Sequence, residues 1–208
     1  SATLDVEPVA TLMGDAPIIA SEGRTFSVET HYLGSPVVDR YKDQFCPAVA
    51  SAIKQALRVE TGSILAFLPG EAEIRRVEKL LNGASLPSTV CVFSLYGALP
   101  QNQQDYAIAP AVSGQRKVVL ATAIAETSLT IEGIRVVVDG GLMRVPRFDP
   151  ASGMTRLITK PVSLAAAAQR QGRAGRLEPG ICYRLWDKAA EGAYQKFNQP
   201  EILDADLA

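Results

Sequence analysis

The residues most suited to chemistry are an amide and two guanidinium groups at helical spacing in a chain of 208 residues. Gln169, Arg173 and Arg176 are four and three residues apart, which would place all three on one face of a helix. Arginine suits a phosphate because its planar fork donates two parallel hydrogen bonds and keeps its charge. Two arginines facing a phosphoryl group would stabilise the charge that develops during its transfer. The alternative is a solvated basic face on an alanine-rich helix.

Two glycines, Gly172 and Gly175, interrupt this segment. Glycine is costly inside a helix, so each needs a compensating role. The role that glycine fills best is a close approach of the backbone to a neighbouring surface. A solvated helix face does not need such an approach, so the glycines favour a site.

A second segment, residues 121–133, collects hydroxyl and carboxylate side chains directly after an apolar run. Thr127 or Ser128 is expected to cap the start of a helix there. The free N–H groups of a helix N-terminus suit an anion such as a phosphate. Ordinary helix capping explains the same residues equally well.

An alternation of strands and helices is expected to position both segments. Apolar residues recur every four positions within residues 38–60, which predicts an amphipathic helix. Short apolar runs bounded by turn residues predict strands that are buried on both faces. Strands are expected at residues 63–68, 89–95, 117–121, 134–138 and 181–186, further helices at 71–81, 101–109 and from 164, and a β-hairpin at about 142–159.

Strands separated by helices imply right-handed crossovers and a parallel sheet. The predicted fold class is therefore α/β, a doubly wound parallel sheet with helices on both faces and an inserted β-hairpin. Ligands of such sheets bind beyond the carboxyl ends of the strands, so the site is expected after residues 68, 95, 121 and 138. No G-x-G-x-x-G follows any of these strands, which argues against a generic dinucleotide-binding domain.

Composition restricts the class of protein. A hydrophobic content of 47% allows one ordinary core. Lys and Arg number 21 against 22 Asp and Glu, which excludes a bulk polyanion binder and leaves a local groove. The three cysteines are widely spaced and indicate a reducing compartment. No run is long enough to span a membrane and the first residues do not resemble a signal peptide, so we expect a cytoplasmic protein without membrane partners.

The two chemical segments, in this order, resemble motifs V and VI of the DEAH-box helicases of superfamily 2. The forms are A-T-A-I-A-E-T-S-L-T-I at residues 121–131 and Q-R-Q-G-R-A-G-R at residues 169–176. The resemblance continues at S-A-T (1–3, motif III), I-L-A-F-L-P-G (64–70, motif IV) and L-Y-G-A-L (95–99, a strand and RNA-facing loop). The L-P-G and Y-G-A-L forms, with residues 132–139, are most similar to the bacterial HrpB-type members. This resemblance implies the second RecA-like domain of an ATP-dependent RNA helicase.

The resemblance also implies roles for single residues. Arg176 would be the arginine finger, and Arg173 would share its catalytic role. Glu132 matches the acidic position that contacts the ribose. The positions that match nucleotide contacts are Gln169, Gly172, Arg173, Arg176, Glu132 and Thr130.

A second group of positions matches contacts to the RNA backbone. Thr122, Thr127 and Ser128 match positions near phosphates, and Gly97 and Ala98 match a loop that also touches them. The hairpin carries three arginines, which either meet phosphate or are solvent-facing strand charges. They are Arg144, Arg147 and Arg156, of which Arg147 is included among the expected RNA contacts.

This chain departs from the family at two positions. Ala123 stands where motif V usually has Asn, so the amide contact of that Asn is missing. Ile108 stands where eukaryotic members place a Phe that stacks on the adenine. An aliphatic side chain offers little stacking, so we expect weak discrimination between ATP and other NTPs.

No phosphate-binding loop is present in the sequence. It contains no G-x-x-x-x-G-K-[ST], no Gly-Lys pair and no acidic D-E-A-H box. ATP or another NTP, together with Mg²⁺, is therefore expected to be held by a separate N-terminal RecA-like domain, a partner in cis. We expect no metal site on this chain and no hydrolysis by the isolated chain.

The expected organisation has three parts. Residues 1–36 form an inter-domain linker that begins at motif III and includes the first strands. Residues 37–187 form the RecA-like helicase C-terminal domain, and residues 188–208 begin a following helical segment. The alternatives are a non-catalytic nucleic-acid-binding or protein-docking module of the same fold, and a DNA translocase. A phosphate-binding loop and an acidic box in the sequence upstream of Ser1 would favour the motor over the module.

Overall fold

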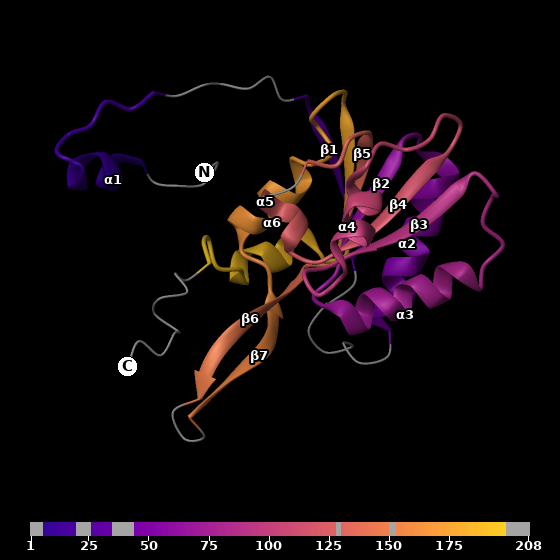
Figure 1. The fold of residues 1–208 in the computed structure, drawn as a ribbon. Coiled ribbons are helices and arrows are strands. Elements are labelled where there is room, and N and C mark those ends of the chain that lie inside the picture. Colours follow the sequence, from indigo (N-terminus) through magenta and orange to yellow (C-terminus); the bar gives the residue numbers. More distant parts are fainter. Residues whose placement is uncertain (1–5, 20–25, 35–43, 128–129, 150–152, 199–208) are drawn as a thin grey trace.

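The computed structural model describes residues 6–19, 26–34, 44–127, 130–149 and 153–198. Within them, six strands form one parallel sheet in the order β1-β8-β5-β2-β4-β3 (Figure 1). The predicted parallel sheet is confirmed. Its strands are β1 Val28–Tyr32, β2 Ser63–Phe67, β3 Val90–Leu95, β4 Arg116–Ala121, β5 Ile134–Asp139 and β8 Gly180–Arg184.

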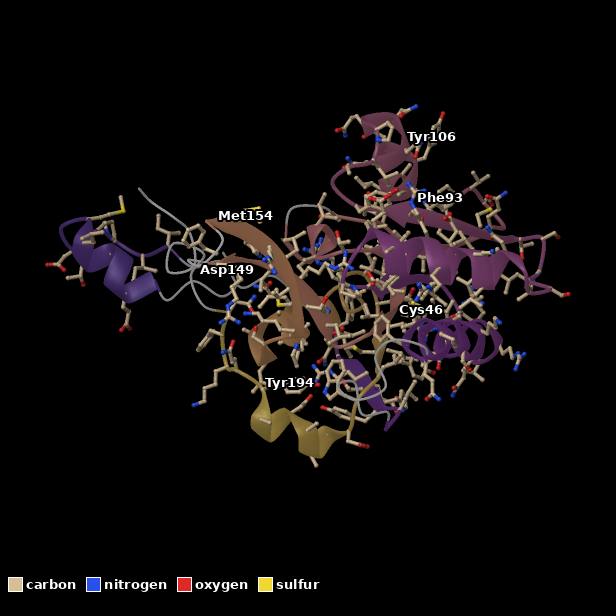
Figure 2. The ribbon with its side chains drawn as sticks, turned by 90° about the horizontal axis from the view of Figure 1, so that it is seen from below. Cys46, Phe93, Tyr106, Asp149, Met154 and Tyr194 are labelled. Carbon is tan, nitrogen blue, oxygen red and sulfur yellow. The ribbon has the colours of Figure 1, made fainter. Side chains whose placement is uncertain are left out.

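Helices cover both faces of this sheet. α2 (Phe45–Val59) and α3 (Glu71–Asn82) pack on one face, and α4 (Gln101–Ile108) and α5 (Ile124–Thr127) pack on the other. Figure 2 shows Cys46 of α2 and Tyr106 of α4 on opposite sides. α6 (Leu164–Gln171) lies against α5 and β5.

The central strand β2 shows why these strands are apolar throughout. All five of its residues are buried, because one helical layer lies above the strand and another below it. Ile64 and Ala66 belong to the core beneath α2 and α3, whereas Leu65 and Phe67 belong to the core beneath α4 and α5. This alternation follows from the period of two along a strand.

The predicted β-hairpin is confirmed as β6 (Leu142–Asp149) and β7 (Met154–Pro161). It projects away from the sheet, with Asp149 and Met154 at its far end (Figures 1 and 2). The hairpin leaves β5 through Gly141, whose φ is 75°. A Cβ atom at Gly141 would lie 2.8 Å from the Trp186 ring, so the turn requires glycine for both reasons.

Three features differ from the sequence expectations. α1 (Val6–Leu12) was not predicted, and it lies apart from the sheet (Figure 1). The helix expected to start near residue 127 is α5, which begins at Ile124 and ends at Thr127, so the capping prediction for Thr127 was wrong; Ser128 lies outside the described residues. The 3₁₀ helix (Lys188–Ala193) that follows β8 is not one of these differences, because a helical segment was expected from residue 188.

The third difference concerns α6. Its N-terminus is capped by Ser163, whose hydroxyl accepts a hydrogen bond from the Ala166 N–H at 3.1 Å. The helix ends at Gln171 because Gly172 follows as the C-cap and the chain then turns. The prediction that Gln169, Arg173 and Arg176 share one helical face was therefore wrong. None of the described helices has the length and apolarity needed to cross a membrane.

Candidate functional site

The segment after α6 is fixed by contact with the strand at the edge of the sheet. The Phe26 N–H donates to the Gly175 carbonyl at 2.9 Å. A Cβ atom on Gly175 would lie only 2.5 Å from the Phe26 carbonyl oxygen. Gly175 therefore makes the close backbone approach expected of it, whereas Gly172 is exposed and only ends the helix.

The two arginines of this segment lie together. The buried Arg173 guanidinium donates to the backbone carbonyl of Glu126 in α5. The exposed Arg176 donates from Nη1 to the Thr130 hydroxyl at 2.7 Å. Both arginines line a narrow crevice with the apolar side chains of Leu65, Ala125, Ile131 and Ile134.

The crevice carries positive charge. Burial, with a smaller contribution from the nearby Arg176 charge, lowers the pKa of Arg173 to about 10, which leaves the group protonated at neutral pH. Among the described residues, no carboxylate forms an ion pair with Arg176. Two neighbouring guanidiniums repel each other, and an anion held between them would relieve that repulsion.

The expected nucleotide positions are only partly brought together. Thr130 bonds Arg176, and the exposed Glu132 lies two residues further along the same turn. Gln169 is half-buried and Gly172 is exposed, both at the last turn of α6. Within this group, the hydrogen bond between Arg176 and Thr130 joins two of the expected positions directly.

The place of this group corrects one expectation. The crevice is lined by Ile134, the first residue of β5, so it lies toward the amino end of that strand. The rule that sites follow the carboxyl ends of strands therefore failed for Arg176, which bonds Thr130 ahead of β5, whereas Arg173 reaches Glu126 in the helix after β4. The reason is that the segment after α6 leads directly into β8 and so reaches the amino edge of the sheet.

The expected RNA positions lie at the opposite edge. β3 and β4 end side by side at Leu95 and Ala121, and the Thr122 N–H donates to the Leu95 carbonyl at 3.1 Å. Gly97 and Ala98 follow β3 and are exposed, with open space around the Gly97 backbone. The side chain of Thr127 and all of Ser128 lie outside the described part.

The hairpin arginines divide into two kinds. Arg147 is exposed and lies directly opposite Arg156, an arrangement of like charges that is unfavourable without an anion. Arg156 has a carboxylate neighbour, Asp149, at 3.5 Å. Arg144 instead turns inward and pairs with Glu73 at 3.1 Å, so it ties the base of the hairpin to α3.

Sequence reasoning missed a buried cluster around Arg170. Its side chain is fully buried between the carboxylates of Glu126, 2.6 Å from its Nη2, and Asp139, 2.8 Å from its Nη1. One signal was available. Asp139 ends a strand buried on both faces, so its carboxylate required a cationic partner.

Comparisons with known proteins show the family to which the chain belongs. The chain belongs to the family described as the helicase conserved C-terminal domain, whose model matches residues 48–178. It is 52% identical over 208 residues to ATP-dependent RNA helicase HrpB of Escherichia coli (strain K12), covering all of this chain and 25% of that protein. It is 43% identical over 196 residues to the pre-mRNA-splicing factor ATP-dependent RNA helicase prp22 of Schizosaccharomyces pombe, covering 91% of this chain and 16% of that protein.

Solved structures give the same result for the fold. A crystal structure of Escherichia coli DEAH/RHA helicase HrpB superimposes with a TM-score of 0.89 at 52% identity, covering 100% of this chain and 26% of that one. The predicted RecA-like α/β fold is confirmed. The chain spans about a quarter or less of the length of these relatives.

Proposed function

We propose that this chain is the C-terminal motor domain of an ATP-dependent RNA helicase and that Arg176 is its arginine finger. The observation that carries the proposal is the pair Arg173 and Arg176, side by side at one crevice with no carboxylate pairing Arg176 among the described residues. Similarity to RNA helicases over the whole chain supports the choice of substrate.

The chain itself supplies only half of the chemistry. ATP, or another NTP, with Mg²⁺ provides the phosphoanhydride that is cleaved, and the N-terminal RecA-like domain in cis would hold both. Arg176 binds the phosphate oxygens and stabilises the charge that develops on them. A hydrogen bond to the Thr130 hydroxyl holds the Arg176 guanidinium at the crevice until a phosphate oxygen replaces that hydroxyl as the acceptor. Arg173 adds a second positive charge, and Gln169, Gly172 and Glu132 complete the nucleotide contacts.

RNA binds at the other edge of the domain in this proposal. Backbone phosphates contact Thr122, Gly97 and Ala98, together with Thr127 and Ser128, and Arg147 on the hairpin contacts a further phosphate. Such contacts hold the strand with little regard to base sequence. The domain comprises residues 37–187 together with β1, which joins the same sheet. The rest of residues 1–36 leads in from the partner domain, and residues 188–208 begin the next segment. We place the protein in the cytoplasm.

The test is Arg176→Ala in the full-length protein. RNA-stimulated NTP hydrolysis should fall by about 10³-fold, the size of effect that an arginine finger provides, while RNA affinity stays near the wild-type value. Arg58→Ala is the matched control, because Arg58 is exposed on α2 at the opposite face. Hydrolysis that survives Arg176→Ala as well as it survives the control would overturn the finger role, and a non-catalytic module would then become the better description.

A further inference from the structure

We propose that Arg170 is a positioning residue that links the base of the β-hairpin to the arginine segment, so that RNA bound at one edge of the domain controls the finger at the other. The inference rests on the proposed function and adds a regulatory connection to it. Arg170 touches neither substrate. It acts through Glu126, Asp139 and Leu142.

The first link joins α6 to α5. The Arg170 Nε donates to the Glu126 carboxylate at 2.7 Å. Arg173 donates to the backbone carbonyl of the same residue. Glu126 is thus held twice, by its side chain and by its backbone, and any displacement of Arg170 shifts the residue that positions Arg173.

The second link joins α6 to the hairpin. The Arg170 Nη1 donates to Asp139 Oδ1 at 2.8 Å and to the Leu142 carbonyl at 3.2 Å. Asp139 Oδ1 also accepts from the Gly141 N–H at 2.9 Å. One guanidinium therefore contacts both ends of the turn through which β5 becomes β6.

Burial makes these links respond together. Arg170 is fully buried and its guanidinium lies 4.9 Å from the centre of the Phe67 ring. A buried ion cluster is a poor source of stability compared with apolar side chains of the same volume. In a medium of low dielectric constant, however, moving one member leaves its partners unpaired, so the cluster favours one discrete arrangement. Burial raises the pKa of the Glu126 carboxyl, although the nearby Arg170 opposes the shift.

The links form one continuous connection between the two expected sites. It starts at Arg147, which is exposed on β6, and enters the domain at Leu142. From there it passes through Arg170 to Glu126 and on to Arg173 at the crevice. Arg144, two residues further along β6, pairs with Glu73 of α3 and so fixes the base of the hairpin to the domain at a second point.

The experiment uses Arg170→Lys in the full-length protein. Lysine keeps the positive charge but lacks the fork that reaches Glu126, Asp139 and Leu142 at once. We expect the ratio of RNA-stimulated to RNA-free hydrolysis to fall by about tenfold, within the usual range of coupling between two sites, while the KM for the nucleotide and the Kd for RNA stay close to wild type.

The matched control is Arg116→Lys. Arg116 also holds two backbone carbonyls with its guanidinium, those of Gly62 and Leu57, each at 2.9 Å, but these bonds reach α2 and the turn before β2, not the hairpin or the arginine segment. The control should keep the wild-type ratio of stimulated to RNA-free hydrolysis. A ratio lowered equally in both variants would show a general loss of packing and would overturn the link.

The remaining outcomes are also decisive. Equal losses of stimulated and RNA-free hydrolysis in Arg170→Lys would make Arg170 a structural residue only. If Arg170→Lys does not fold, Glu126→Gln provides the test, because glutamine keeps the shape and one acceptor oxygen of Glu126 and removes its charge. An unchanged ratio of RNA-stimulated to RNA-free hydrolysis in Glu126→Gln would refute the link. A wild-type protein without RNA-stimulated hydrolysis would instead overturn the proposed function, which is a separate result.

Discussion

The two faces of the sheet differ in the side chains that they bury. The face under α2 and α3 is closed by apolar side chains, including Val49, Ile53 and Leu81. The face under α4 and α5 contains the buried charges Lys117, Asp139, Arg170 and Arg173. Burying a charge costs more than burying hydrocarbon, and the cost is met only by near-complete pairing. One face therefore mainly supplies stability, whereas the other gives up some stability to hold charged groups in place.

The largest expected effect on stability comes from the apolar face. Ile53 is completely buried, and Ile53→Ala should lower the free energy of unfolding by about 3 kcal/mol through lost transfer energy and a residual cavity. Denaturant unfolding of this chain measures it, with Val59→Ala on the exposed side of the same helix as the control. Below the melting temperature, the full-length variant should keep its hydrolysis rate. A large loss of hydrolysis rate in the folded variant would contradict the view that the apolar face contributes to stability alone.

A smaller effect is expected from Lys117 on the charged face. Its Nζ donates to the carbonyls of Tyr106, Ala107 and Ala109, at 2.7, 2.9 and 2.6 Å, and so closes the end of α4. Lys117→Met leaves these acceptors without their donor and should cost about 2 kcal/mol. Unlike the core substitution, it should also raise the KM for the nucleotide in the full-length enzyme, because the last turn of α4 carries Ile108. The control is Lys79→Met, because Lys79 is exposed on α3. An unchanged KM in Lys117→Met would show that α4 does not contribute to nucleotide binding.

The smallest effect concerns the base of the nucleotide. Ile108 is half-buried and packs against the core beneath α4 and α5, so it offers an edge of hydrocarbon and no ring. We therefore expect this face to bind the phosphates more than the base, and kcat/KM for ATP and GTP should differ by less than about tenfold. Ile108→Phe should increase the preference for ATP. A strong ATP preference in the wild-type enzyme would contradict the prediction.

The sequence predicted the apolar face well. The strands fall within one or two residues of their expected bounds, because a run such as residues 63–68 is apolar, short and bounded by glycine or proline. The spacing of Phe45, Val49 and Ile53 gave α2 for the same reason. These signals are local, since burial on one or both faces imposes its period on the residues themselves.

The charged face was predicted less well, because its contacts are not local. Arg170 meets Asp139 and Glu126, which are 31 and 44 positions away, and no periodicity records such pairs. The arginine segment was expected to be helical, yet Gly172 ends α6 and the contact between Gly175 and Phe26 decides where the chain goes next. Motif resemblance singled out Arg173 and Arg176 but could not predict that Arg176 would bond Thr130 ahead of β5.

The strand order also determines when this domain can be completed. β1 lies at the margin of the sheet, and its one neighbour there among the described strands is β8, which is separated from it by nearly the whole chain: Val28 pairs with Gly180. A growing polypeptide must therefore release β8 from the ribosome before β1 can find its place. Until then Val28 lacks its strand partner, and the carbonyl of Phe26 has no Gly175 to pack against. The contact between Phe26 and Gly175 can therefore form only after residues 172–180 have been synthesised, when most of the sheet is already available.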